Sequence, residues 1–144
     1  MERAATTGNL GFLLAKASQR WNELLGQAFK ERGHGHVRPS YGSLLLPLWV
    51  EDGLRMGELA RRARLSKQTL TTMVRLMERD GLVLREPDPE DGRASRVRLT
   101  PRAKRLKPVA DEVVGALTAR VQERLSPHQA RELERGLRAI AALQ

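Results

Sequence analysis

Residues 57–100 read GELARRARLSKQTLTTMVRLMERDGLVLREPDPEDGRASRVRLT and carry the clearest structural signals of the chain. The first half predicts a short helix through Ala63, a connection of about three residues, and a longer helix that follows Ser66, a good N-cap residue. Gly81 is typical of the position just after a helix ends. The longer helix has an apolar inner face, formed by Leu70, Met73, Val74 and Met77. Two helices joined in this way predict a helix-turn-helix.

A β-hairpin is expected directly after the helix-turn-helix. The apolar run Leu82–Glu86 predicts a strand, and the polar residues 87–93, with two prolines, two aspartates and a glycine, predict a turn. Between Ala94 and Leu99, valine and leucine alternate with arginine, which is strand periodicity. A hairpin beside a helix-turn-helix predicts a winged helix.

Further helices are expected on both sides of the winged helix. Apolar residues recur at three- and four-residue spacing from Leu10 to Ala28, ahead of a glycine-rich loop. A second helix is expected over residues 39–51, bent at Pro47, and a short strand over residues 54–56. On the C-terminal side, Thr100-Pro101 predicts the start of a long helix that Pro108 kinks, and the capping box SPHQ at 126–129 predicts a last helix.

The predicted fold class is mainly α with a small β-hairpin wing. A winged helix-turn-helix DNA-binding domain over residues 39–100 is flanked by N- and C-terminal dimerisation helices, which form one helical lobe from residues 1–38 and 101–144. Helices this long bury too little of their apolar stripes against one small centre, so a second copy of the chain is expected to cover the surplus. A monomeric helical bundle is the alternative to this homodimer.

Positive charge is concentrated in the middle of the chain. The net charge is +9, and residues 55–107 hold 15 basic and 7 acidic residues, whereas the remainder of the chain holds 11 and 10. This distribution is typical of a module that binds a polyphosphate. The alternative is an arginine-rich solvated surface, since 21 of the 26 basic residues are Arg.

The longer helix of the helix-turn-helix is expected to offer a polar face to DNA. After the cap Ser66, this face carries Lys67, Gln68, Thr69, Thr71, Thr72 and Arg75, with no glutamate between Lys67 and Met77. Such side chains suit a helix in the major groove, where Gln and Arg pair with base edges and hydroxyls reach phosphates. An ordinary exposed helix would carry more glutamate.

The hairpin tip is expected to enter the adjacent minor groove. Arg93 lies at the tip, Arg96 and Arg98 lie on the returning strand, and Asp91 is placed to hold the Arg93 guanidinium by a bidentate pair. The alternative is that Asp91 only favours the turn and Arg93 is solvated. No aromatic residue lies within the basic segment, which favours duplex DNA over single strands.

Residues 57–100 resemble the winged helix of MarR-type transcriptional regulators, most closely in the pattern Asp88-Pro89-x-Asp91-x-Arg93-Ala94 and Val97-x-Leu99-Thr100. The resemblance implies an intertwined dimer whose recognition helices enter successive major grooves of a pseudopalindrome. It also implies that Asp91 and Arg93 are the wing pair and that residues 66–75 make the groove contacts. Two departures, Ala103 in place of a common glycine and Pro108, bear on the angle of the long helix.

The same resemblance implies a ligand-released repressor with a small aromatic acid bound between the dimerisation lobe and the winged helix. The predicted lining is Trp21, Phe29, Tyr41 and Trp49, with Arg38 or Arg20 meeting an anionic group. The alternative is that these aromatic residues only pack the core and the dimer interface.

Several classes of function are disfavoured. The chain has no Cys, which excludes thiol chemistry, and its three histidines are too few and too scattered for a zinc site, so neither a metal nor a cofactor is expected. No phosphate loop, nucleophile elbow or metal helix indicates an enzyme. The chain lacks a membrane-length apolar run, and MERAATTGNLG lacks a signal core, so a cytoplasmic protein without membrane association is expected.

The sequence therefore predicts a transcriptional regulator that binds double-stranded DNA sequence-specifically. The expected form is a ligand-responsive repressor that binds a pseudopalindromic operator as a homodimer. The alternative is an architectural DNA-binding protein that is indifferent to sequence.

Overall fold

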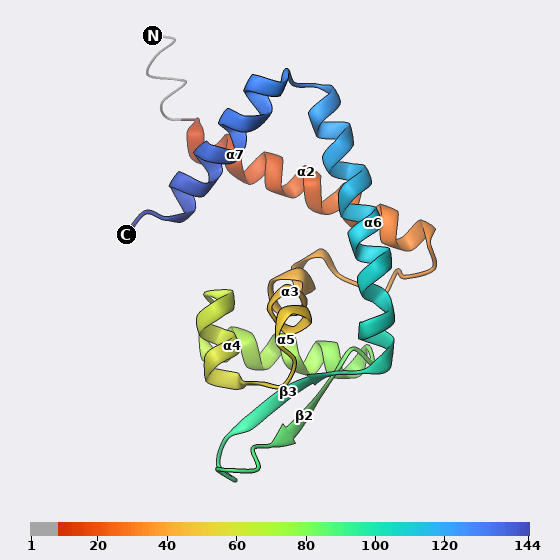
Figure 1. The fold of residues 1–144 in the computed structure, drawn as a ribbon, viewed down its shortest axis with the longest axis vertical. Helices are drawn as coiled ribbons and strands as arrows, with labels where there is room; N and C mark the ends of the chain where they lie inside the picture. Colours follow the sequence, from red (N-terminus) through yellow and green to blue (C-terminus); the bar gives the residue numbers. More distant parts are fainter. Residues whose placement is uncertain (1–8) are drawn as a thin grey trace.

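A computed structural model describes residues 9–144. In chain order its elements are α2 (Leu10–Glu31), η1 (Pro39–Tyr41), α3 (Gly42–Val50), β1 (Leu54–Arg55), α4 (Met56–Ala63), α5 (Lys67–Arg79), β2 (Val83–Pro87), β3 (Ser95–Leu99), α6 (Pro101–Glu123) and α7 (Pro127–Ala141). Helices α2, α6 and α7 lie on one side of the molecule, and the β2–β3 hairpin projects from the opposite end (Figure 1). The prediction of a mainly helical protein with a small wing is confirmed.

The helix-turn-helix forms as predicted, and local chemistry explains its ends. Arg64 ends α4 in the left-handed conformation, with φ 55°. The Ser66 hydroxyl oxygen accepts the Thr69 amide at 3.1 Å, which caps α5. Gly81 follows α5 with φ 74°, where a residue without Cβ is favoured.

The sheet has one strand more than the predicted hairpin. Its order is β1-β3-β2 and both pairings are antiparallel. The expected short strand at residues 54–56 is β1, which pairs Leu54 with Val97 and Arg55 with Arg96. The wing is therefore fixed along β3 to the segment that precedes α4, and it is not a free ribbon.

Helix α6 connects the winged helix to the upper helices. It begins where predicted, with the Thr100 hydroxyl accepting the Ala103 amide at 3.2 Å. It continues through Pro108 as one helix of 23 residues. The predicted capping box of α7 is confirmed, with Ser126 and Gln129 each bonding the backbone of the other.

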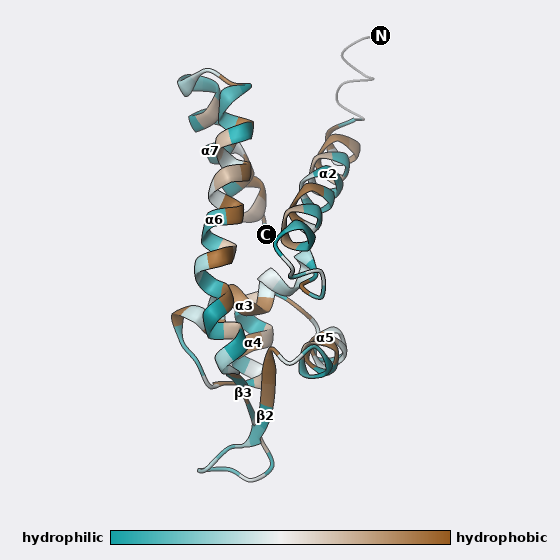
Figure 2. Ribbon diagram, turned by 90° about the vertical axis from the view of Figure 1, so that its right-hand side faces the viewer, coloured by the Kyte–Doolittle hydropathy of each residue, from teal (hydrophilic) through white to brown (hydrophobic). Residues whose placement is uncertain are grey.

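The core lies under the winged helix and thins toward the upper helices. Buried side chains from α3, α4, α5, the sheet and α6 form one cluster, to which α2 adds only Leu25 and Phe29 near its C-terminal end. No residue of α7 is buried. Apolar side chains exposed on these helices are Leu10, Phe12 and Leu13 of α2, Val114 of α6, and Leu133, Leu137 and Ile140 of α7. Figure 2 shows α2 and the α6–α7 pair extending away from the hairpin, with apolar segments along both.

No helix within residues 9–144 has the length and apolar character that crossing a bilayer requires. The same residues contain no cluster of three side chains suited to hold a metal ion.

Candidate nucleic-acid interface

The predicted DNA face of α5 is mostly exposed. Residues at 66–69, 72 and 75 are exposed, and only Thr71 is half-buried. Gln68, Thr72 and Arg75 are separated by four and three residues, so they share one side of the helix. Ser66 is the cap of α5, and the Thr71 and Thr72 hydroxyls donate to the Lys67 and Gln68 carbonyls at 2.8 and 3.1 Å. These two hydroxyl hydrogens are engaged within the helix, which leaves the oxygen atoms available as acceptors.

Helix α5, the wing and the start of α4 meet around one hollow of about 270 Å³, the α5–wing hollow. Lys67 and Thr71 line it from α5, Arg93 to Ser95 line it from the wing, and Met56 and Gly57 line it from α4. Two cations from separate elements and the positive end of a helix dipole therefore face one space, an arrangement suited to an anion such as a phosphate.

The wing tip differs from one expectation. Arg93 is exposed, and the Asp91 carboxylate accepts the backbone amide of Arg93 at 3.1 Å. Within residues 9–144 no ion pair joins the Arg93 guanidinium to Asp91 or to another acid. The predicted bidentate pair is therefore corrected: Asp91 shapes the turn, because a short Asx side chain bonds most readily to the amide two residues on, and the guanidinium stays in solvent.

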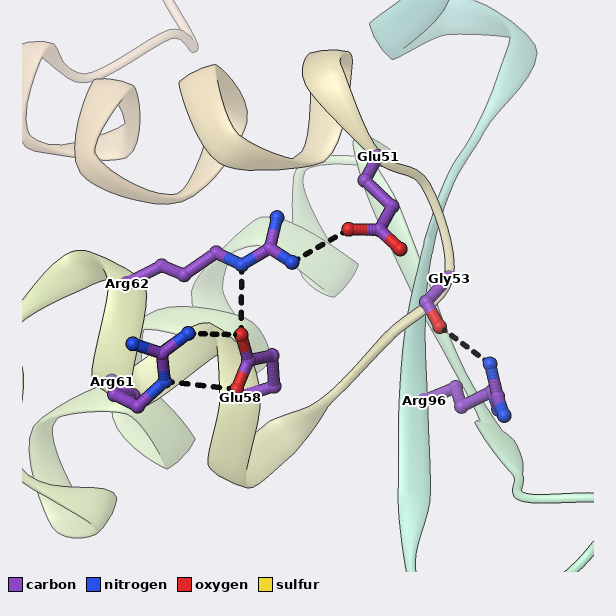
Figure 3. Close-up of polar contacts among 6 residues, drawn as sticks. All are labelled: Glu51, Gly53, Glu58, Arg61, Arg62 and Arg96. Carbon is purple, nitrogen blue, oxygen red and sulfur yellow. Dashed lines mark hydrogen bonds and ion pairs between the residues drawn. The ribbon is translucent and has the colours of Figure 1, made fainter.

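Arg96 also differs from its prediction as a DNA contact. Its side chain is half-buried, and its Nη1 donates to the Gly53 carbonyl at 3.1 Å (Figure 3). Its Nε lies 3.5 Å from the Asp88 carboxylate. Arg96 instead holds β3 to the turn before β1, because its position in the middle strand of the sheet points it at that turn.

Asp88, which belongs to the wing pattern quoted above, has a structural role that was not predicted from the sequence. It is the buried charged residue of the wing base, only 3% exposed, and it pairs with Arg55 and Arg96. The Glu90 amide donates to its carboxylate at 2.9 Å. That hydrogen bond lowers the pKa of Asp88, and the two guanidinium charges lower it further, against the effect of burial. The strand register explains this role of Asp88. Arg55 and Arg96 face each other across β1 and β3, and an anion between them compensates the two like charges.

The arginines of α4 form a second set of ion pairs. Glu58 accepts from Arg61 and Arg62, and Arg62 also donates to Glu51 at the end of α3 (Figure 3). The hydrogen bonds from Arg61 and Arg62 lower the pKa of Glu58 to about 2. Arg62 therefore joins α4 to the end of α3, and the charges of both arginines are locally neutralised.

The ion pairs sort the cations of the basic segment into two groups. Nine of the fifteen lie in ion pairs: Arg55, Arg61, Arg62, Arg79, Arg85, Arg96, Arg98, Lys104 and Lys107. The other six have no acidic partner among the described residues. Lys67, Arg75 and Arg93 are exposed on α5 or on the wing tip, whereas Arg64 donates to the Ala141 carbonyl, Arg102 donates to the Asp80 carbonyl, and Arg105 is exposed on α6. Half of the uncompensated cations of this segment therefore lie on the predicted DNA face.

A cavity of about 310 Å³ lies between α2, α3 and α6, and we call it the inter-lobe cavity. Trp21, Phe29, Arg38 and Trp49 line it, as predicted. The Trp49 indole donates to the Ala103 carbonyl at 3.1 Å, which joins α3 to α6.

The prediction that Tyr41 lines this cavity is wrong, because Tyr41 lies outside the cavity wall. It is 1% exposed, and its hydroxyl donates to Asp80 at 2.5 Å. Burial and this hydrogen bond raise the pKa of Tyr41 to about 12. Arg20, the other cation predicted to meet an anionic group in the cavity, does not line it either. Arg20 is exposed and pairs with Glu23 at 3.1 Å. Arg38 is the cation that reaches the cavity.

Comparison with known proteins identifies the family. The MarR family model matches residues 39–95, which cover the helix-turn-helix, β2 and the wing tip up to the first residue of β3. An HTH-type transcriptional repressor of Mycobacterium tuberculosis is 38% identical over 119 residues, which cover 74% of this chain and 86% of the relative. The chain belongs to the MarR family. This MarR protein is therefore a DNA-binding transcriptional regulator and not an enzyme.

Solved structures agree with this MarR fold over almost the whole chain. The repressor CouR, bound to a 23-mer DNA duplex, superposes with a TM-score of 0.81 at 24% identity and covers 94% of each chain. The PcaV regulator of Streptomyces coelicolor, in complex with its natural ligand, has a TM-score of 0.77 at 21% identity and covers 92% of this chain and 91% of its own.

Proposed function

We propose that this MarR-family protein is a homodimeric repressor that binds a pseudopalindromic operator and is regulated by a small aromatic or anionic effector. The proposed DNA-binding mode rests on which cations have acidic partners and which do not. Lys67, Arg75 and Arg93 are exposed and unpaired among the described residues, whereas most of the other cations in the basic segment, such as Arg61 and Arg98, lie in ion pairs. Exposed charges without intramolecular partners are the ones free to meet phosphates.

We assign three kinds of DNA contact to Gln68 and these cations. Gln68 and Arg75 on α5 face base edges in the major groove, while Lys67 in the α5–wing hollow holds a backbone phosphate. Arg93 reaches the adjacent minor groove from the wing tip. The likeness to CouR, whose structure holds a DNA duplex, supports this arrangement.

A homodimer is proposed because the upper helices lack a partner within the chain. Helix α7 has 15 residues and none of them is buried, although its leucines and isoleucine form an apolar stripe. At about 25 cal/mol per Å² of apolar surface, leaving such a stripe in water forgoes several kcal/mol. The dimerisation lobe is assigned to residues 1–38 and 101–144, of which 1–8 lie outside the described residues, and the DNA-binding domain to residues 39–100.

The inter-lobe cavity is the proposed effector site. Its volume of about 310 Å³ suits a small molecule, and its wall combines the Trp21, Phe29 and Trp49 rings with the Arg38 cation. Apolar rings with one cation at the edge are suited to an aromatic acid. The ligand complex of PcaV supports a site of this kind. The protein is proposed to act in the compartment that holds the chromosome, which is the cytoplasm in the prokaryotic relatives.

The experiment that tests this function is a selection of genomic fragments followed by a shift assay with excess non-specific duplex. We expect the selected operator to remain bound, since specific affinity typically exceeds non-specific affinity by about 10³-fold or more. Loss of the complex at low competitor would instead indicate an architectural protein indifferent to sequence.

The same assay tests the wing. Arg93→Ala is expected to weaken operator binding by about 1–3 kcal/mol, as for loss of one specific contact. Arg135→Ala on α7 is the matched control, because that arginine is exposed and pairs with Glu132 at 3.1 Å, away from the DNA face. Equal affinity of the two variants at matched salt would refute the wing assignment.

A further inference from the structure

Trp21 belongs to two hollows at once. From the middle of α2 its indole lines the inter-lobe cavity, opposite Trp49 and Arg38. The same indole lines a second hollow of about 400 Å³ between α6 and α7, the α6–α7 groove, together with Val121, Leu125, Leu133 and Leu137. Trp21 is half-buried and packs against the core cluster.

In the proposed homodimer, the second copy of the chain packs into the α6–α7 groove. Its wall is mainly apolar, and its α7 side carries Leu133 and Leu137, which are exposed. The same chain also exposes an apolar helix end, Leu10 and Leu13 at the start of α2. A two-fold dimer requires that one chain carry both members of each complementary pair of surfaces. A groove and an unpartnered apolar helix end on one chain meet that requirement, so we take the occupant to be a second copy.

We infer that Trp21 is a positioning residue that couples occupancy of the inter-lobe cavity to the seating of the partner copy in the α6–α7 groove. This inference rests on the proposed homodimer and effector site. The indole is one rigid unit that borders both hollows, so a shift of the ring out of one hollow carries it into the other. An occupant of the cavity pushes the ring toward the groove, where it takes space from the partner and weakens the dimer. Such a differential contact is what links two sites energetically.

The test fills the cavity with a side chain, so that it requires no knowledge of the effector. Gly42 lines the cavity, has ordinary helical backbone angles of −57° and −33°, and has no atom within 4 Å of an added Cβ. Gly42→Leu therefore extends into the cavity, and Gly42→Ala is the matched control for the backbone effect. Sedimentation equilibrium gives the dimer dissociation constant of each variant.

We expect the dissociation constant of Gly42→Leu to be at least about threefold above that of Gly42→Ala, and this difference to disappear when both also carry Trp21→Ala. Equal dissociation constants with Trp21 present, or an undiminished difference without it, would overturn the inference. A Gly42→Ala protein that stays monomeric at all concentrations would refute the proposed dimer itself, whereas a dimer without coupling refutes only the role of Trp21.

A second measurement guards against misfolding of the Trp21→Ala variants. In Trp49→Phe, Trp21 is the sole tryptophan, because the chain has two. Its emission is expected to shift on dilution through the dimer midpoint and to differ between the Gly42→Ala and Gly42→Leu versions. Emission that is unchanged in both comparisons would contradict contact of this indole with both sites.

Discussion

Asp88 decides whether the wing holds its shape. Its carboxylate lies between Arg55 and Arg96, two cations that face each other across neighbouring strands. Asp88→Asn keeps an acceptor for the Glu90 amide and removes only the charge, so the two guanidinium groups repel without compensation. We expect a lower Tm and weaker operator binding, because the displaced wing carries Arg93 with it.

Asp91→Asn is the control for this prediction, since among residues 9–144 the Asp91 side chain bonds only to the backbone amide of Arg93. A thermal melt and a binding titration on both variants give the ranking. Should Asp91→Asn cost as much as Asp88→Asn, the charge at Asp88 is not what holds the wing.

His36 makes folding stability sensitive to acid. Burial lowers the pKa of His36, and the positive charges of Arg102 and His34 lower it further, while Asp80 opposes them. Because the folded-state pKa lies below the unfolded value of about 6.5, the unfolded chain binds the proton more readily. Stability is therefore unaffected above that pH and is lost as the pH falls through the window below it.

The check is the free energy of unfolding of wild type and His36→Asn, measured by denaturant at pH 7.5 and at pH 5. We expect the acid-induced loss to be smaller in His36→Asn, since the titrating group is gone. An identical loss in both proteins would assign the acid sensitivity to other groups.

At the scale of single elements, the start of α5 has two roles that substitutions separate. The Ser66 side chain caps the helix at its Thr69 amide, and Ser66 also lies at the exposed end of the DNA face. Ser66→Ala is expected to lower the free energy of unfolding by about 0.5–2 kcal/mol. Ser66→Asp keeps a capping oxygen and adds negative charge, so it retains stability and weakens DNA binding by repulsion from phosphates.

Unfolding and operator titrations on the two variants test this separation. If Ser66→Asp retains its DNA affinity, the first turn of α5 does not contact DNA. If Ser66→Ala is as stable as wild type, the Ser66 cap does not contribute to stability.

The elements themselves were largely predictable from sequence, because their signals are local. Ser66, Gly81, Thr100 and the box at 126–129 each act within about one helical turn, and all are found where predicted. The third strand was predicted as a short strand, but its place in the sheet was not. A two-residue strand has no periodicity of its own, and β1 exists through its pairing with β3.

Side-chain partners were less predictable than elements, because they depend on packing between distant segments. Arg93 and Arg96 lie three residues apart in a basic hairpin, yet one is exposed and the other braces Gly53. Tyr41 and Trp49 both precede the basic segment, yet Tyr41 bonds to Asp80 while Trp49 lines the inter-lobe cavity. Composition shows how much charge a segment has but not which charges are neutralised.

At the scale of the whole molecule, we propose that the unpaired cations on α5 and the wing meet DNA phosphates, while the ion-paired cations hold the fold. The logarithm of the operator affinity falls linearly with the logarithm of salt concentration, and the slope counts the phosphates neutralised. This slope therefore measures the claim directly.

The decisive measurement is the salt slope of wild type, Lys67→Ala and Arg98→Ala. Lys67 is unpaired among the described residues, and Arg98 pairs with Glu86 at 2.6 Å on the same winged helix. We predict that Lys67→Ala reduces the magnitude of the slope by about 1 per protomer bound, and that Arg98→Ala leaves it near the wild-type value. An unchanged slope in Lys67→Ala, or an equal reduction in Arg98→Ala, would contradict the account.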